Sequence, residues 1–156
     1  MITVLTSEDV PWIHEIDANT AVFSPEEVET VDGMVQEYLQ QGAEKTGYYF
    51  IVSREEGRVL GYACYGPRAL TDGTYDLYWI AVDPNARGGG VGKKLLAAAE
   101  EGMRALGGRL VIVETSGLLE YESTRAFYRA TEYLQEATLK DFYAAGDDLV
   151  IFTKHL

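Results

Sequence analysis

Cysteine and positive charge are both scarce in this sequence of 156 residues. Cys64 is the single cysteine, which excludes an intramolecular disulfide and a cysteine-based metal cluster; a small buried apolar residue is its expected role. Lysine and arginine number 13 against 25 aspartates and glutamates, so the formal net charge is -12. Because such a surface repels nucleic acid and anionic membrane, neither is expected as a partner.

Long apolar runs are missing as well. No segment approaches the roughly 20 apolar residues that a membrane-spanning helix needs. The N-terminus has no basic region followed by an apolar core, which is the pattern of a signal peptide. We therefore expect a cytoplasmic chain. Since no linker, repeat or low-complexity segment divides it, we also expect a single domain over residues 1–156.

Helix and strand patterns alternate in an order that predicts an α+β fold. Apolar residues spaced three and four apart predict four helices, which begin near Ser7, at Ser24, after Gly92 and near Ser123. Strands are predicted over residues 2–5, 48–54, 58–65, 74–82, 109–115, 133–142 and 149–153. The second, third and fourth form an antiparallel meander, and the following strand–helix–strand passage implies a parallel crossover. We expect a mixed, mostly antiparallel twisted sheet of six to seven strands with about four helices.

The second helix has the clearest start and stop signals. Ser24 is placed to cap it, Pro25 occupies its first position, and Glu27 completes a capping box. Gly33 lowers the helix propensity of its interior, and Gly42 is expected to end it.

A glycine-rich turn connects the last strand of the meander to the next helix. Residues 82–94 read Val-Asp-Pro-Asn-Ala-Arg-Gly-Gly-Gly-Val-Gly-Lys-Lys. The first N–H groups of a helix lack internal partners and lie at the positive end of its dipole, and glycine lets a ligand approach them. After Asp83, the only charged side chains of the turn are Arg87, Lys93 and Lys94. The turn is therefore predicted to bind a phosphate or pyrophosphate.

Three phosphate-binding patterns compete for this turn. A P-loop needs a glycine five residues before Gly-Lys-Ser/Thr, but counting back from Gly92-Lys93 gives Arg87, and Lys94 replaces Ser/Thr. A dinucleotide fingerprint needs Gly-x-Gly-x-x-Gly after a parallel strand, and no register of the turn supplies its last glycine. Both fail. The remaining pattern is Arg-x-x-Gly-x-Gly, met by Arg87, Gly90 and Gly92.

After a strand ending Val82-Asp83-Pro84, this pattern resembles the GCN5-related N-acetyltransferase (GNAT) superfamily. The resemblance covers nearly the whole chain and implies a single-domain GNAT fold. It also implies transfer of an acetyl group from acetyl-CoA to an amine, with no metal. In the family, the backbone of the preceding strand contacts the pantetheine arm and the turn holds the pyrophosphate. The cofactor-binding residues so implied are Ile80, Ala81, Val82, Arg87, Gly88, Gly89, Gly90, Val91, Gly92 and Lys93.

Acyl transfer to an amine needs a neutral amine, a stabilised carbonyl oxygen and a proton for the leaving thiolate. The resemblance implies Tyr128 as the acid, and a phenol suits this role because it keeps its proton at neutral pH. Asp76 matches the strand position where some relatives carry a glutamate base. Glu114, near the end of the following strand, is the rival base. A water relay or no dedicated base is the third option.

Strand alternation places Asp76 on the same face as Tyr78 and Ile80. Tyr78 and Trp79 are expected to shape the acceptor pocket and the core rather than to take part in chemistry. Two departures from the family pattern stand out. Tyr121 occupies the position of an asparagine that contacts pantetheine in many relatives, and Glu132-Tyr133 replaces a common Gly-Phe.

The acceptor is expected to be a small-molecule amine that binds against the first two helices and the loops over residues 67–73 and 118–122. The acidic composition favours a cationic amine, with protein N-termini and lysines as alternatives. The C-terminal hairpin is a candidate contact for a homodimer. A different class of function is a non-catalytic acyl-CoA-binding module or sensor that uses the same fold.

Overall fold

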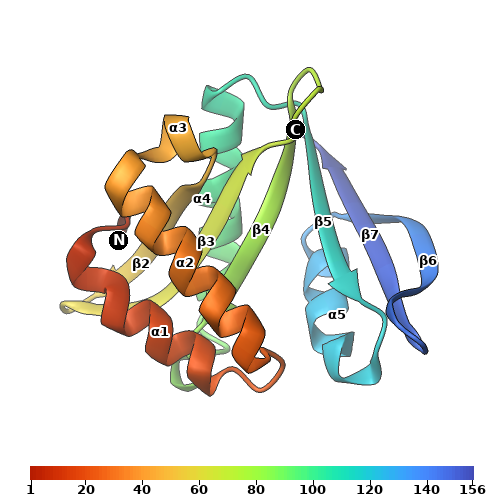
Figure 1. Cartoon of the computed structure of the whole chain (residues 1–156), viewed down its shortest axis with the longest axis horizontal. Coiled ribbons are helices and arrows are strands. Elements are labelled where there is room, and N and C mark those ends of the chain that lie inside the picture. The colour runs from red at the N-terminus through yellow and green to blue at the C-terminus, as the bar shows by residue number, and fades with distance from the viewer.

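A computed structural model describes all 156 residues, and one seven-stranded sheet runs through the chain (Figure 1). The strands are β1 (Ile2–Val4), β2 (Tyr49–Glu55), β3 (Arg58–Pro67), β4 (Thr74–Val82), β5 (Leu110–Ser116), β6 (Leu134–Ala144) and β7 (Asp147–His155). Their order in the sheet is β1-β2-β3-β4-β5-β7-β6, and only β4 and β5 pair in parallel. The predicted mixed, mostly antiparallel sheet with a parallel crossover is confirmed.

Five helices flank the sheet, one more than predicted. They are α1 (Val10–Asn19), α2 (Pro25–Gln41), α3 (Ala43–Thr46), α4 (Val91–Ala105) and α5 (Glu122–Ala130). The additional helix, α3, is a single turn between Gly42 and Gly47, which both have positive φ angles. The first helix begins near Ser7 as predicted, with the 3-10 turn η1 (Ser7–Asp9) running directly into α1, and its N-cap is Thr6. None of the helices combines the length and apolarity needed to cross a membrane.

The predicted signals at both ends of α2 are confirmed. The Glu27 N–H donates to Ser24 Oγ at 3.1 Å, and the Ser24 N–H donates to Glu27 Oε1 at 3.2 Å. These two bonds satisfy two of the N–H groups that a helix start leaves free. At the other end, Gly42 stops the helix with φ +85°, a conformation that L-residues with a side chain rarely adopt.

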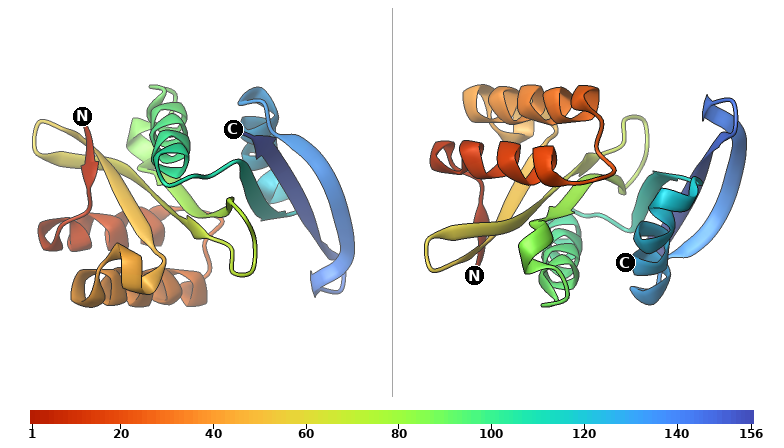
Figure 2. Two further views of the ribbon diagram at one scale, coloured as in Figure 1. Left: turned by 90° about the horizontal axis from the view of Figure 1, so that it is seen from above. Right: turned by 90° about the horizontal axis from the view of Figure 1, so that it is seen from below.

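The helices pack on both faces of the sheet, with α1 and α2 on one face and α4 and α5 on the other (Figure 2). On the α4 and α5 face, the first core includes Leu95, Leu96, Ala99, Met103, Val111, Tyr128 and Phe152. On the α1 and α2 face, the second core includes Ile13, Ile16, Val31, Val35, Phe50, Tyr62 and Cys64. The expectation of a buried apolar role for Cys64 is confirmed.

The strands β4 and β5 stay paired over only three residues. Asp76 opposite Ile112 is the last pair, and beyond it the two strands diverge, as Figure 1 shows. From Leu77 to Val82, β4 pairs with β3 alone. One edge of β4 is therefore left without a strand partner in the middle of the sheet.

A bulge in β4 lies at the point where the strands diverge. The register with β3 shifts by one residue between Leu77 and Trp79, so Tyr78 has no partner. As a result, Leu77 and Ile80 both pack on the first core, and Trp79 packs on the second. The prediction that Ile80 shares a face with Asp76 is wrong, because one extra residue exchanges the two faces of a strand.

Candidate active site

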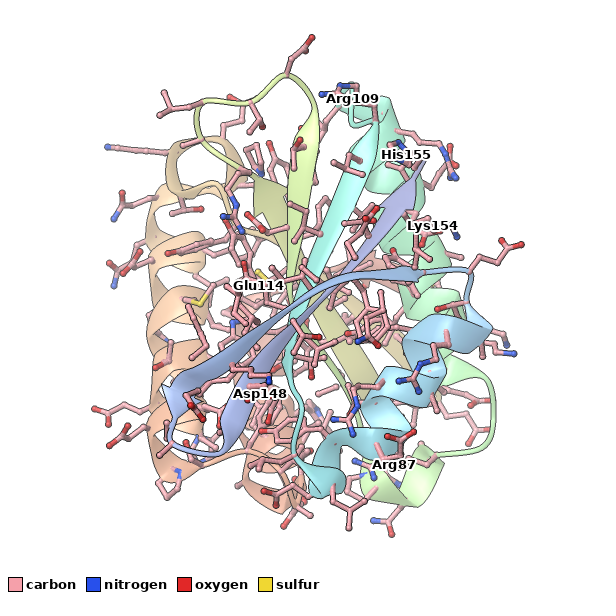
Figure 3. The ribbon with its side chains drawn as sticks, turned by 90° about the vertical axis from the view of Figure 1, so that its right-hand side faces the viewer. Arg87, Arg109, Glu114, Asp148, Lys154 and His155 are labelled. Carbon is pink, nitrogen blue, oxygen red and sulfur yellow. The ribbon has the colours of Figure 1, made fainter.

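A cleft of about 1790 Å³ opens where β4 and β5 separate, and residues from both faces of the sheet line it. We call it the central cleft. Figure 3 views this part of the molecule, with Glu114 and Asp148 left of centre and Arg87 at the lower right. The turn side is formed by the glycine turn and α5. The α2 side is formed by the start of α2, the β3–β4 loop, the turn η3 (Leu119–Tyr121) and the β6–β7 hairpin.

The turn side presents a row of free backbone amides. The N–H groups of residues 88–93 donate no hydrogen bond within the protein. Gly88 and Gly90 have φ angles of +85° and +78°, and a Cβ atom at either would meet nothing within 4 Å. Glycine is therefore required there by the backbone conformation and not by crowding. Arg87 and Lys93 flank these amides, are exposed and form no ion pair, so the site suits an anion.

Gly92 is required for a different reason. A Cβ atom at this position would lie 3.3 Å from the Phe127 ring and 3.6 Å from Val82 Cγ2. Its absence lets the first turn of α4 pack closely against α5 and the end of β4. A large side chain at Gly92 would therefore disturb this packing as well as any ligand. Gly89 has an ordinary φ angle and open space around it, which makes it the cleaner position for a test.

The unpaired edge of β4 borders the same cleft. Ile80, Ala81 and Val82, which the family resemblance implied as cofactor contacts, all line it. Because β5 has moved away, the N–H and C=O groups on this edge have no ladder partner. An extended ligand can form main-chain hydrogen bonds to such an edge, as an added strand would.

Tyr128 is buried on α5 and lines the cleft. Its ring packs against Phe127, Tyr133 and Phe152 at centroid distances of 5.4, 5.6 and 5.7 Å. Burial raises the pKa of Tyr128, so its proton stays on throughout the neutral range. Since no protein group accepts this proton, the hydroxyl can donate it to a molecule in the cleft.

An arginine joins the two carboxylates that the sequence singled out. Arg68 Nε donates to both Asp76 oxygens, at 3.2 and 2.9 Å, and Arg68 Nη2 donates to Asp76 Oδ1 at 2.6 Å. The same Nη2 donates to Glu114 Oε1 at 3.0 Å. The bonds to Asp76 and then to Glu114 raise the pKa of Arg68, so the guanidinium remains a cation.

Asp76 and Glu114 differ in whether one of their carboxylate oxygens has no hydrogen-bond partner. Both oxygens of Asp76 accept from Arg68, and its side chain is only 10% exposed. Glu114 is 39% exposed and accepts one bond, through Oε1, which leaves Oε2 without a partner. Of the two candidate bases, Glu114 therefore has the oxygen that can accept a further proton.

The two aromatic residues expected near the acceptor both line the cleft. Tyr78, the bulged residue, packs edge-on against Tyr48 at 5.9 Å. Trp79 packs edge-on against Phe23 at 5.6 Å, and its indole N–H donates to Met34 Sδ at 3.2 Å. Trp79 thereby connects β4 to the loop before α2 and to α2 itself.

The structure gives both departures from the family pattern a packing role. The Tyr121 hydroxyl donates to the Val22 carbonyl at 3.0 Å, so it ties η3 to the loop before α2. Glu132 has φ +73°, the left-handed region that a glycine would occupy without strain. The Tyr133 hydroxyl donates to buried Glu100 at 2.7 Å, a bond that phenylalanine could not form.

Sequence reasoning missed Arg68. It is the only cation between Arg58 and Arg87, and it falls in a segment predicted only as a loop. A lone cation in such a long segment was a signal of a specific role, but the sequence does not identify the groups that it contacts. The contact with Asp76 depends on the path of the loop, and the contact with Glu114 depends on the pairing of β4 with β5.

The sequence model of the acetyltransferase (GNAT) family matches residues 13–133. A crystal structure from Desulfovibrio desulfuricans, assigned to the GNAT family, is 41% identical and has a TM-score of 0.95, with 99% of this chain and 98% of that chain covered. A Salmonella typhimurium protein, solved with its cofactor acetyl-CoA, shares the fold at 22% identity and a TM-score of 0.79, over 100% of this chain and 93% of that chain.

A relative of known name matches part of the chain. The IAA acetyltransferase of Azospirillum brasilense is 38% identical over 82 residues, which are 51% of this chain and 50% of that protein. The alignment thus spans half the length of that relative.

Proposed function

The chain belongs to the acetyltransferase (GNAT) family, and from this premise we propose that it transfers the acetyl group of acetyl-CoA to the primary amine of a small-molecule acceptor. One observation carries the proposal. The free amides of Gly88 and of residues 90–93, the unpaired edge of β4 and Tyr128 border one cleft, which thus offers groups for the pyrophosphate, the pantetheine arm and the thioester of an acyl-CoA.

The turn side fits the phosphate groups and pantetheine arm of acetyl-CoA. The amides of residues 88–93 are unpartnered, the space before Gly88 and Gly90 is open, and Arg87 and Lys93 add positive charge. Ile80, Ala81 and Val82 offer the strand edge for the pantetheine arm. The bound acetyl-CoA of the Salmonella typhimurium protein supports this assignment by fold.

The residues of the cleft can supply each proton transfer. Acetyl-CoA brings a thioester, whose carbonyl carbon is the electrophile. Glu114 Oε2 accepts a proton from the acceptor's ammonium, so that the amine becomes a nucleophile. The Tyr128 hydroxyl donates its proton to the departing sulfur, and the resulting phenolate takes up the second proton that the attacking nitrogen loses as the amide forms. N–H groups on the free edge of β4 are available to the carbonyl oxygen as negative charge develops.

The charge of the cleft favours a cationic acceptor. Six carboxylates line it, from Glu26, Glu27, Asp76, Glu114, Glu120 and Asp147, against three cations, Arg68, Arg87 and Lys93. Two of these cations flank the glycine turn, and the third is bound to Asp76 and Glu114. An amine that arrives protonated is therefore attracted to the α2 side, and an anionic acceptor is repelled.

Release of free thiol from acetyl-CoA tests the proposal. We expect turnover with pooled primary amines, arranged as diamines, amino sugars, amino acids and short peptides, to exceed acetyl-CoA hydrolysis at least about tenfold. Tyr128→Phe should lower turnover by about 100-fold and leave acetyl-CoA affinity unchanged. Tight acetyl-CoA binding with no amine-dependent thiol release from any class would instead support a non-catalytic acyl-CoA-binding module.

A further inference from the structure

Arg68 lies between the two carboxylates at the point where β4 and β5 separate. We infer that Arg68 is a positioning residue, which holds the Glu114 carboxylate in the central cleft with Oε2 toward the acceptor amine. The inference rests on the proposed role of Glu114 as proton acceptor. It gives Asp76 a different role from the one that the sequence suggested, as the anchor of the arginine.

The need for such a residue follows from the strand geometry. Asp76 and Ile112 form the last β4–β5 pair, and Glu114 lies two residues beyond it on β5. At that position the neighbouring strand has already turned away. The single hydrogen bond from Arg68 is the only one that the Glu114 side chain forms. Without it, the carboxylate would be free to rotate out of the cleft.

Arg68 is itself firmly placed. Its backbone N–H donates to the Thr74 carbonyl at 2.8 Å, and its carbonyl accepts from Thr71 Oγ1 at 2.8 Å, so the loop after β3 is closed on itself. Three contacts then fix the guanidinium on Asp76, whereas one contact reaches Glu114. Because of this difference, Asp76 anchors the Arg68 guanidinium, and Glu114 is the carboxylate that accepts a proton from the acceptor amine.

The charges around Glu114 give the arginine a second effect. Arg68 of the preceding loop bonds both Glu114 and Asp76 of β4, and Tyr143 of β6 interacts electrostatically with Glu114, Asp147 and Glu27. Arg68 is the only cation among these groups. If it were removed, the charges of Glu114 and Asp76 would repel each other without compensation. Arg68 therefore also keeps this repulsion from turning the Glu114 carboxylate away from its place in the cleft.

Variants at Arg68 separate this role from simple support of the loop. In the full chain, Arg68→Gln should lower kcat about 10- to 100-fold with the best amine of the thiol-release screen, and leave the KM for acetyl-CoA unchanged. Arg68→Lys should recover part of the loss, since an ammonium can reach one carboxylate but cannot bridge both as a guanidinium does. Arg104→Gln is the matched control: Arg104 is 45% exposed against 44% for Arg68, and it pairs with one carboxylate far from the cleft.

A structural readout needs no acceptor. In the full chain with labelled glutamate side chains, the NMR signals of the Glu114 side chain should show rotamer averaging in Arg68→Gln and one fixed rotamer in the parent chain. An unchanged rotamer together with unchanged kcat would overturn the inference, and so would a rise in the acceptor KM alone, because that pattern belongs to direct substrate binding.

The double variant distinguishes failure of this inference from failure of the proposed function. If Glu114→Gln turns over like the parent chain, the acetyl-transfer activity stands, but Glu114 is not the proton acceptor and the inference about Arg68 falls with it. If Glu114→Gln is slow and Arg68→Gln slows it further by its full factor, Arg68 does not act through Glu114 and only the positioning role falls. The expected result is that Arg68→Gln costs little once Glu114 is absent.

Discussion

The two sides of the central cleft differ in which groups they offer to a ligand. The turn side offers backbone groups, and its free amides come from one uninterrupted run, residues 88–93. The α2 side is made of side chains, and its charged groups come from α2, β4, β5, β7 and two connecting segments. A backbone site is fixed by local conformation, whereas a side-chain site is fixed by the whole fold. Substitutions should therefore block the turn side by bulk and disable the α2 side by charge.

Each half of the molecule also contains a buried carboxylate, and the two carboxylates differ in their hydrogen bonds. In the first core, Glu100 accepts from the Tyr133 hydroxyl, and Lys154 Nζ donates to both of its oxygens at 3.1 and 3.3 Å. In the second core, Asp17 accepts one bond, from the Tyr62 hydroxyl at 2.8 Å, and its Oδ2 is buried with no partner. The α2 half of the molecule thus contains a carboxylate whose ionisation opposes folding.

Of the substitutions on the two sides of the cleft, Glu114→Gln on the α2 side should have the largest effect, and it should act on kcat. Removing the proton acceptor should lower kcat by at least about 100-fold, and acetyl-CoA affinity, measured by calorimetry, should stay unchanged because the turn side is intact. Asp76→Asn should cost less than Glu114→Gln, since it loosens Arg68 but leaves the Glu114 carboxylate present. Glu101→Gln, an exposed substitution on α4, is the control and should behave like the parent chain. A larger loss from Asp76→Asn would return the role of base to Asp76.

Asp17 should make the protein less stable as the pH rises. Burial, the largest cause, raises the pKa of Asp17 from 3.8 to about 7 in the folded chain. The folded state therefore holds a proton that the unfolded state releases, and stability falls between about pH 4 and pH 7. At about 1.4 kcal/mol for each pKa unit, the loss amounts to a few kcal/mol.

Urea unfolding from pH 5 to pH 8 measures this loss, and Asp17→Asn should flatten the profile over that range. Asp83 and Glu122 have lowered pKa values, held down mainly by the Asn85 backbone N–H and by Arg125, so their contributions are lost only at more acidic pH. Any change in stability between pH 5 and pH 8 is therefore assigned to Asp17 and not to Asp83 or Glu122. Equal slopes for the parent chain and Asp17→Asn would mean that the orphan carboxylate is satisfied in solution.

The contrast between a backbone site and a side-chain site also explains which features could be predicted from the sequence. The turn side could be predicted because the glycines, the charges and the helix start of residues 82–94 lie next to one another in the chain. The caps of α2 and the bounds of β4 were predictable for the same reason. The bulge at Tyr78 was not, because nothing within β4 marks the residue at which its register with β3 shifts.

The α2 side shows what local patterns leave out. Asp76 and Glu114 could each be singled out, but their ranking depends on which oxygens remain free, and that is decided by Arg68. Arg68 is eight residues from Asp76 and 46 from Glu114 along the chain, so only the folded loop and the short β4–β5 pairing bring the three together.

On the turn side, Gly89→Leu should raise the acetyl-CoA dissociation constant at least about tenfold, or about 1.4 kcal/mol. Gly89 has an ordinary φ angle and no neighbour closer than 3.6 Å, so the fold should tolerate the side chain, which adds bulk in the middle of the run of free amides. Gly33→Leu is the matched control, because Gly33 also has an ordinary φ angle and open space but lies on α2. Equal affinity in both variants would exclude the turn as the phosphate site.

The smallest effect concerns a left-handed position that lacks glycine. Gly88 and Gly90 adopt positive φ angles without strain, whereas Glu132, at φ +73° after α5, carries a side chain in the same region. Glu132→Gly should therefore stabilise the fold by about 1 kcal/mol, measured as a shift in the urea midpoint with an unchanged m-value. The pair that it removes, with Lys154 at 4.0 Å, is too exposed to offset this gain. Glu101→Gly, inside α4, should destabilise by a similar amount, so opposite signs for two Glu→Gly changes would identify backbone conformation as the cause. A loss of stability in both would show that the position after α5 tolerates glutamate without strain.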